Sequence, residues 1–144
     1  KPLRALHQAF LKGDAEGVAA GLTAIMGKMI SVLDTKARDA QKENFYHGIL
    51  LGLLGYKSNW LIKSNVESGI GYSDILIETE DQETGIIIEI KYAETGNLEA
   101  VSEDALKQIE DRRYEEQLLE EGVEHILKYG IAFYKKKCKV MAVK

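Results

Sequence analysis

Two acidic side chains and a lysine interrupt stretches that otherwise have the composition of buried strands. Asp74 stands in Gly-Tyr-Ser-Asp-Ile-Leu-Ile, and Glu89 and Lys91 stand in Ile-Ile-Ile-Glu-Ile-Lys. Alternation along a strand puts Glu89 and Lys91 on one face, and Asp74 can lie opposite Glu89 on the preceding strand. Two such carboxylates offer the oxygen ligands that Mg²⁺ takes, and a lysine beside them can orient water or stabilise developing negative charge. An Asp–Lys or Glu–Lys ion pair at an edge strand is the alternative.

Two further polar residues fall on the apolar stripes of predicted helices. Glu43 shares its stripe with His47, and a buried carboxylate is costly unless it is paired or bound to metal. Alternatively, Glu43 lies near a solvated helix end and pairs with Lys36 or Lys42. Gln108 lies within the packing stripe of a later helix, so its amide could reach the site or be a satisfied core polar group.

Hydrophobic periodicity predicts the elements that must position these residues. Helices are expected over residues 3–12, 14–30, about 34–54 and 98–121, and strands over residues 58–66, 71–78, 85–93, 124–134 and 138–143. This order predicts an α/β (α+β) fold, with a mixed β-sheet of about five strands flanked by helices. Residues 1–33 would form an N-terminal helical extension, and residues 34–144 a single compact core.

The composition limits the class of protein. With 144 residues, 45% hydrophobic and 29% charged, the chain has the size of one domain and can bury a core. A single cysteine, Cys138, excludes an internal disulfide and favours a reducing, cytoplasmic location. No apolar run approaches the roughly 20 residues of a membrane span. Because the chain opens at Lys1-Pro2, it is expected to be a piece of a longer protein.

The net charge of −4 conceals a strong asymmetry along the chain. Residues 99–121 carry 3 basic and 9 acidic side chains, whereas residues 122–144 carry 6 basic and 1 acidic. The acidic total does not favour a general nucleic-acid binder. It does not exclude a phosphate substrate either, because a bound divalent metal would neutralise part of the negative charge.

The chain resembles the PD-(D/E)xK nuclease superfamily. The resemblance rests on a helix with Glu43, two strands with Asp74 and with Glu89 and Lys91, and a following helix with Gln108. The resemblance is closer to one branch, usually found C-terminal to an AAA-ATPase-like domain in bacterial proteins, and it covers nearly the whole chain. The matching segments are Glu43-Asn44-Phe45-Tyr46-His47-Gly48, Glu67-Ser68-Gly69-Ile70-Gly71-Tyr72-Ser73-Asp74, Ile87-Ile88-Glu89-Ile90-Lys91, Gln108-Ile109 with Tyr114, and Tyr129-Gly130-Ile131-Ala132-Phe133.

The resemblance implies a restriction-endonuclease-like core and a role for each matching residue. Asp74 and Glu89 would be ligands of Mg²⁺ or Mn²⁺, and Lys91 the catalytic lysine. Glu43 would be a further acidic metal ligand or would orient water. Gln108 would line the catalytic site.

Four more positions are candidates for contacting substrate. Tyr72 stands where the branch often has arginine, which would reduce affinity for DNA if that arginine contacts phosphate. Tyr114 faces away from Gln108 unless the helix ends or bends between them. His47 is expected to pack or to hydrogen-bond to the site more than to ligate metal, and Glu67 is either a site acid or a turn residue.

The function that the resemblance implies is metal-dependent hydrolysis of DNA phosphodiester bonds by an activated water. The expected partners are DNA and an upstream AAA-ATPase-like domain, with a possible homodimer. The alternative is a non-cleaving nuclease-fold module that binds nucleic acid or protein beside the ATPase. A purely structural or dimerisation module is a third possibility, which a lack of affinity for divalent metal would favour.

Overall fold

A computed structural model describes residues 2–28, 39–56, 59–67, 72–81, 83–111 and 114–143; within these ranges, the side chains of residues 39–41, 65–67, 72–73, 114 and 117 are not described. The elements are α1 (Pro2–Lys12), α2 (Ala15–Gly27), α3 (Asp39–Gly55), β1 (Leu61–Glu67), β2 (Tyr72–Glu78), β3 (Thr84–Tyr92), α4 (Leu98–Asp111), α5 (Tyr114–Glu120), β4 (His125–Tyr134) and β5 (Lys137–Val143). None of the described helices is long and apolar enough to cross a membrane.

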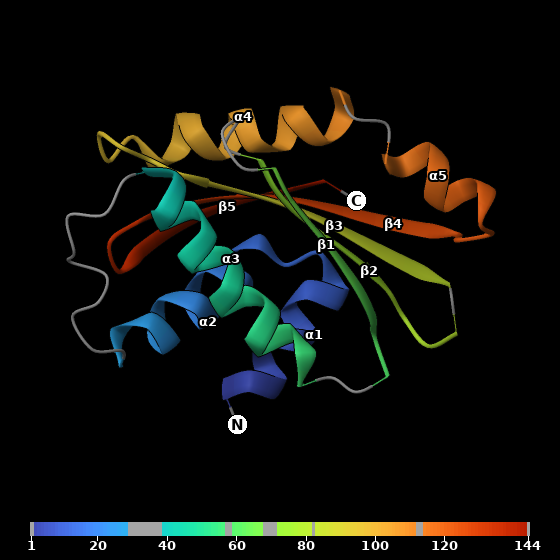
Figure 1. The fold of residues 1–144 in the computed structure, drawn as a ribbon. Coiled ribbons are helices and arrows are strands. Elements are labelled where there is room, and N and C mark those ends of the chain that lie inside the picture. Colours follow the sequence, from blue (N-terminus) through green and yellow to red (C-terminus); the bar gives the residue numbers. More distant parts are fainter. Residues whose placement is uncertain are drawn as a thin grey trace.

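The strands form one sheet in the order β1-β2-β3-β4-β5. Strands β1, β2 and β3 form an antiparallel meander, β3 and β4 are parallel, and β5 returns antiparallel to β4. The parallel pair requires a crossover, which α4 and α5 supply (Figure 1). The predicted mixed sheet flanked by helices is therefore confirmed.

One face of the sheet carries the main core, under α1, α2 and α3. Alternate residues of β3, namely Ile86, Ile88 and Ile90, are fully buried in one cluster with Leu6 and other apolar residues of these helices. The hydroxyl of the buried Tyr129 on β4 donates a hydrogen bond to the Phe10 carbonyl at 2.5 Å, and burial raises the pKa of that hydroxyl. The predicted N-terminal helices thus share a core with the sheet.

The opposite face of the sheet is covered by α4, which crosses close above β4. Ile87 of β3 packs there against Ile109 of α4. A Cβ atom on Gly130 of β4 would overlap the carbonyl oxygen of Ser102 and lie 2.5 Å from the backbone nitrogen of Leu106. Glycine is therefore required at position 130 for α4 to lie this near the sheet.

The predicted single helix over residues 98–121 is wrong: the structure has two helices, α4 ending at Asp111 and α5 beginning at Tyr114. The buried Lys128 of β4 donates to Glu110 at 2.7 Å and pairs with Glu115. On a straight helix these two glutamates would point about 140° apart. Burial lowers the pKa of Lys128, but its bonds to Glu110 and Glu115 outweigh that effect and raise it.

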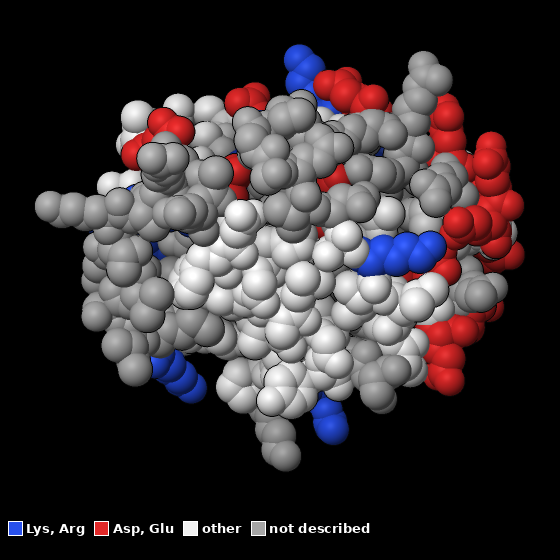
Figure 2. All heavy atoms as spheres, viewed as in Figure 1, with Lys and Arg blue, Asp and Glu red and all other residues white. Residues whose placement is uncertain are grey.

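Charge is distributed unevenly over the surface. Figure 2 shows acidic side chains gathered at the end of the molecule that carries α5 and the turn between β2 and β3. Helix α5 has Glu115 and Glu116 in its first turn and leads into the start of β4. Lys135, Lys136 and Lys137 follow the other end of that strand. The sequence asymmetry therefore becomes an acidic end and a basic turn at opposite ends of β4.

Gly130→Ala should reduce the free energy of unfolding by about 1–3 kcal/mol, because the added methyl group must displace the backbone of α4. The matched control is Gly52→Ala on α3, where a Cβ meets nothing within 4 Å. That change should raise stability by about 0.5–1 kcal/mol, since alanine favours helix. Urea unfolding measures both; an unchanged midpoint for Gly130→Ala would contradict the close approach of α4.

Candidate active site

A row of three residues crosses the centre of the sheet beneath α4. Asp74 of β2 lies directly opposite Glu89 of β3, which in turn lies beside Gly130 of β4. Side chains at one register position share a face, and the contact of Gly130 with α4 identifies that face. The predicted opposition of Asp74 and Glu89 is confirmed, and both carboxylates point to the side that α4 covers.

Both carboxylates are removed from solvent. Asp74 is 1% exposed and Glu89 is 0% exposed, and the neighbouring Ile75, Ile88 and Ile90 are also fully buried. Each acid makes further polar or electrostatic contacts within the fold. Like charges directly across a ladder are nevertheless destabilising, and burying a charge adds a desolvation cost. A sheet selected only for stability would place apolar side chains at these two positions.

Lys91 extends the row toward the end of β3. It lies two residues beyond Glu89, on the same face, and its register partner in β4 is Ala132. Among the described residues, the β2–β3 ladder ends at the pair Ser73–Ile90. Lys91 is half-buried, whereas Glu89 is fully buried. A ligand that approaches from this end of the strand would meet the ammonium before the carboxylates.

Glu43 of α3 is tied to the same strand end. Its Oε1 accepts a hydrogen bond from the backbone N–H of Tyr92 at 3.2 Å, and Tyr92 directly follows Lys91. A side chain from α3 thus reaches the end of the strand that carries Glu89 and Lys91. This contact brings the helical glutamate to the site region that the sequence motif predicts.

The donor set suits a hard divalent cation, although it is small. Among the described residues, no three His, Cys, Asp or Glu side chains form a group that could hold a metal ion. The metal-ligand role of Glu43 therefore stays a prediction. Mg²⁺ is commonly bound through only one or two carboxylates, with water and substrate phosphate completing its shell. Asp74 and Glu89, buried on adjacent strands, meet that requirement.

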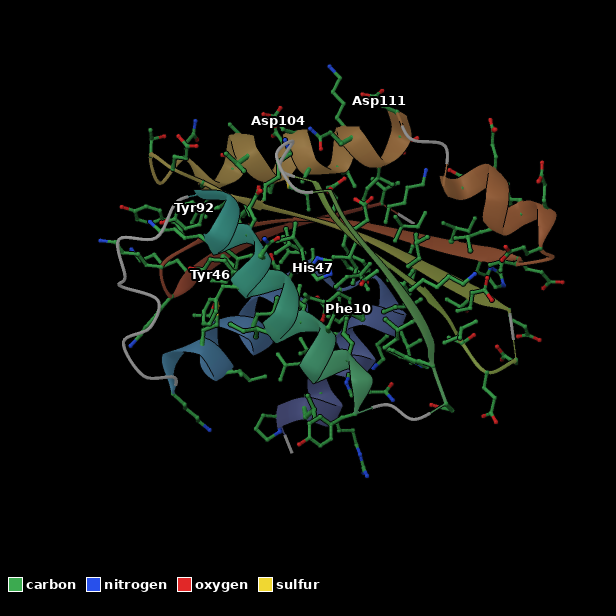
Figure 3. All side chains as sticks on the ribbon, in the orientation of Figure 1. Phe10, Tyr46, His47, Tyr92, Asp104 and Asp111 are labelled. Carbon is green, nitrogen blue, oxygen red and sulfur yellow. The ribbon has the colours of Figure 1, made fainter. Side chains whose placement is uncertain are left out.

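His47 lies on α3, on the side that faces the strands (Figure 3). It is 2% exposed, and neither ring nitrogen has a hydrogen-bond partner in the structure as described. Burial lowers its pKa, while the negative charge of Asp74 acts in the opposite direction. A neutral, buried imidazole near Asp74 agrees with the expectation of a packing residue more than with that of a ligand.

Gln108 on α4 is half-buried, and its buried Oε1 accepts no hydrogen bond from the described residues. A buried amide oxygen in this state favours a polar ligand or water nearby. The side chains of Glu67, Tyr72 and Tyr114 lie outside the described residues, so their substrate-binding roles stay predictions. Tyr114 begins a separate helix, so a straight-helix projection from Gln108 no longer applies.

Sequence reasoning missed the aromatic residues around the Glu43 contact. The ring of Tyr92 has the ammonium of Lys42 4.7 Å from its centroid, and it lies 6.0 Å from the ring of Tyr46 in a stacked arrangement. The available signal was that Tyr92 immediately follows the Glu-x-Lys motif. The spacing of charged residues alone could not reveal this contact.

Comparison with known families agrees with this geometry. Residues 41–143, which are more than half of the chain and run from the first turn of α3 to the end of β5, match the model of the PD-(D/E)XK nuclease superfamily. The five-stranded mixed sheet flanked by helices is consistent with a restriction-endonuclease-like fold. No curated protein and no solved structure matched the chain. The chain belongs to the PD-(D/E)XK nuclease superfamily.

Proposed function

We propose that the chain is a divalent-metal-dependent nuclease that hydrolyses the phosphodiester bonds of DNA. The observation that carries the proposal is the buried, directly opposed pair of Asp74 and Glu89 in a chain of this superfamily. A module that only bound a partner would have no need for two like charges beneath α4. We further propose, from the resemblance to one branch alone, that an AAA-ATPase-like domain precedes it in the full protein.

Asp74 and Glu89 would hold Mg²⁺ or Mn²⁺ through their carboxylate oxygens. The bound ion would make water a stronger nucleophile and would neutralise charge on the phosphate. The protein contributes a fixed separation of the two acids, since both lie on adjacent paired strands. It also excludes bulk water from one side, because α4 covers the row.

The neighbouring polar groups would act on the substrate and on water. The three N–H donors of Lys91 would bind a phosphate oxygen at the strand end and stabilise negative charge that develops during attack. Glu43, held by the N–H of Tyr92, would orient the attacking water through its carboxylate. The buried Oε1 of Gln108 would accept a hydrogen bond from water or substrate.

Glu89→Ala and Lys91→Ala should each reduce DNA cleavage by about 100-fold or more, because each removes a group needed at the reacting phosphate. The assay follows plasmid and single-stranded DNA with Mg²⁺ and with Mn²⁺. Glu99→Ala and Lys107→Ala, which remove the same charges from exposed positions on α4, should cut at the native rate. Cleavage that survives in the Glu89 or Lys91 variant would come from a contaminant or a different site, and would contradict the proposal.

Asp74→Asn should stabilise the metal-free chain by up to about 1 kcal/mol, because it removes one of two facing like charges. The same change should abolish stabilisation by Mg²⁺. For the native chain, this stabilisation reaches about 2.7 kcal/mol when the free Mg²⁺ concentration is about 100 times Kd. Thermal unfolding in EDTA and in Mg²⁺ measures both effects. A native melting temperature that does not respond to Mg²⁺ or Mn²⁺ would favour the structural alternative.

His47→Phe should make the free energy of unfolding less sensitive to low pH. Since burial holds the pKa of His47 below its ordinary 6.5, the unfolded chain takes up a proton first as the pH falls. Native stability is therefore lost as the pH drops below about 6.5, and the phenylalanine variant should lose less. Urea unfolding between pH 7.5 and 5.5 tests this, with His125→Gln at an exposed site as the control. Parallel pH profiles for all three chains would contradict the neutral, buried imidazole.

A further inference from the structure

Aromatic rings from α3, β3 and β4 gather where β3 and β4 end. We call this group the aromatic–lysine cluster; its members are Tyr46, Tyr92, Phe133 and Tyr134, with Lys42 and Lys135 over two of the rings. Figure 3 labels Tyr46 and Tyr92 side by side at this end of the molecule. The rings of Tyr46 and Phe133 are stacked, with centroids 4.4 Å apart and planes 7° apart.

One of the two lysine-capped rings borders solvent. The ammonium of Lys135 lies 5.4 Å from the centroid of Tyr134, and Lys42 donates to the hydroxyl of Tyr92 at 3.4 Å. Tyr134 is half-buried and Lys135 exposed. The face of Tyr134 beside Lys135 therefore borders solvent, whereas Tyr92 is only 9% exposed. Lys135 can turn from its ring toward an anion and leave the face of Tyr134 to another planar group.

The turn between β4 and β5, which carries Lys135, is tied to α3. Lys135 has φ of 53°, an uncommon value for a residue with a side chain, and its carbonyl accepts a hydrogen bond from the Tyr46 hydroxyl at 2.7 Å. A residue persists in this region where its surroundings fix it, often at functional sites. The basic turn is therefore anchored to α3.

The cluster adjoins the candidate active site. Lys42 reaches the hydroxyl of Tyr92, and the next residue of α3, Glu43, binds its backbone N–H. The Cα of Tyr92 lies three residues, or about 10 Å, along β3 from that of Glu89. Tyr92 points to the α3 face and Lys91 to the α4 face, so a bound strand would cross the end of β3 between them.

We propose that the aromatic–lysine cluster binds an unpaired segment of nucleic acid and so selects single-stranded or frayed substrates. A base would stack on Tyr134 while Lys42 and Lys135 contact the flanking phosphates. Bases in a duplex already stack on each other, whereas the faces of unpaired bases are free to stack on aromatic rings. An acidic peptide could use the lysines but would have no use for the rings. This proposal rests on the proposed nuclease function and names its substrate class.

Binding is measured without cleavage, by fluorescence anisotropy of a labelled 15-nucleotide oligo-dT in EDTA, against a 15-base-pair duplex. The single strand should bind at least tenfold more tightly. Tyr134→Ala should weaken its binding by about 5- to 150-fold, the range measured for one stacked base, whereas Tyr134→Phe should bind like the native chain. Lys107→Ala on α4 is the matched charge control and should also bind like the native chain.

The variant Lys135→Gly distinguishes a role of this lysine in binding from a role in stability. Glycine adopts a φ of 53° without strain, so this variant should melt at or above the native temperature. It should nevertheless bind oligo-dT more weakly, with a shallower dependence of affinity on salt, because one phosphate contact is lost. A lysine with only a structural role would not produce this combination.

The outcomes distinguish failure of this proposal from failure of the nuclease proposal. Equal affinity for duplex and single strand, native binding by Tyr134→Ala, or equal competition by polyglutamate would each overturn the role of the cluster. If one of these results is found but Glu89→Ala no longer cleaves DNA, the nuclease proposal is still supported. Conversely, selective oligo-dT binding by a native chain that cuts nothing with Mg²⁺ or Mn²⁺ would support the cluster and overturn the nuclease.

Discussion

The register between β2 and β3 places two carboxyl side chains opposite one another inside the sheet, and the candidate chemistry depends on that opposition. Because side chains alternate along a strand, a slip of one residue would turn Asp74 to the other face and separate it from Glu89. The apolar residues next to this pair along the ladder fix the register. Ile75 and Ile88 are paired across the same ladder and fully buried on the main-core face. Burial of the main core therefore stabilises the opposition of Asp74 and Glu89, which repulsion between two carboxylates would disfavour.

The rest of the fold supports this row from both sides. Above it, Gly130 lets α4 approach the sheet, and the ion pairs of Lys128 fix α4 and α5 relative to β4. Below it, α1 and α2 close the main core. The link from Glu43 to the N–H of Tyr92 then connects α3 to the end of β3. Acidic side chains gather at the α5 end of the face that Figure 2 shows, so an anionic substrate would approach the basic turn at the other end of β4.

Much of this could be predicted from the sequence, because the signals are local. Short segments rich in β-branched and aromatic residues predicted the strands, and the positions of Asp74 and Glu89 on neighbouring strands of a meander predicted that they could face each other. The break between α4 and α5 could not be predicted, since no glycine or proline marks it and Lys128, far along the chain, binds glutamates from both helices. The aromatic–lysine cluster was missed for the same reason: Tyr46, Tyr92 and Tyr134 lie on three elements that only the fold brings together.

The central claim is that Asp74 and Glu89 together bind one divalent cation. A crystal of the chain grown with Mn²⁺ tests this most directly, because the anomalous scattering of manganese locates the ion independently of the protein atoms. The account predicts one anomalous peak within about 2.0–2.5 Å of a carboxylate oxygen from each residue, with Lys91 on the same side of β3. Carboxylates that point to different faces, or manganese bound only at the acidic surface near α5, would contradict it.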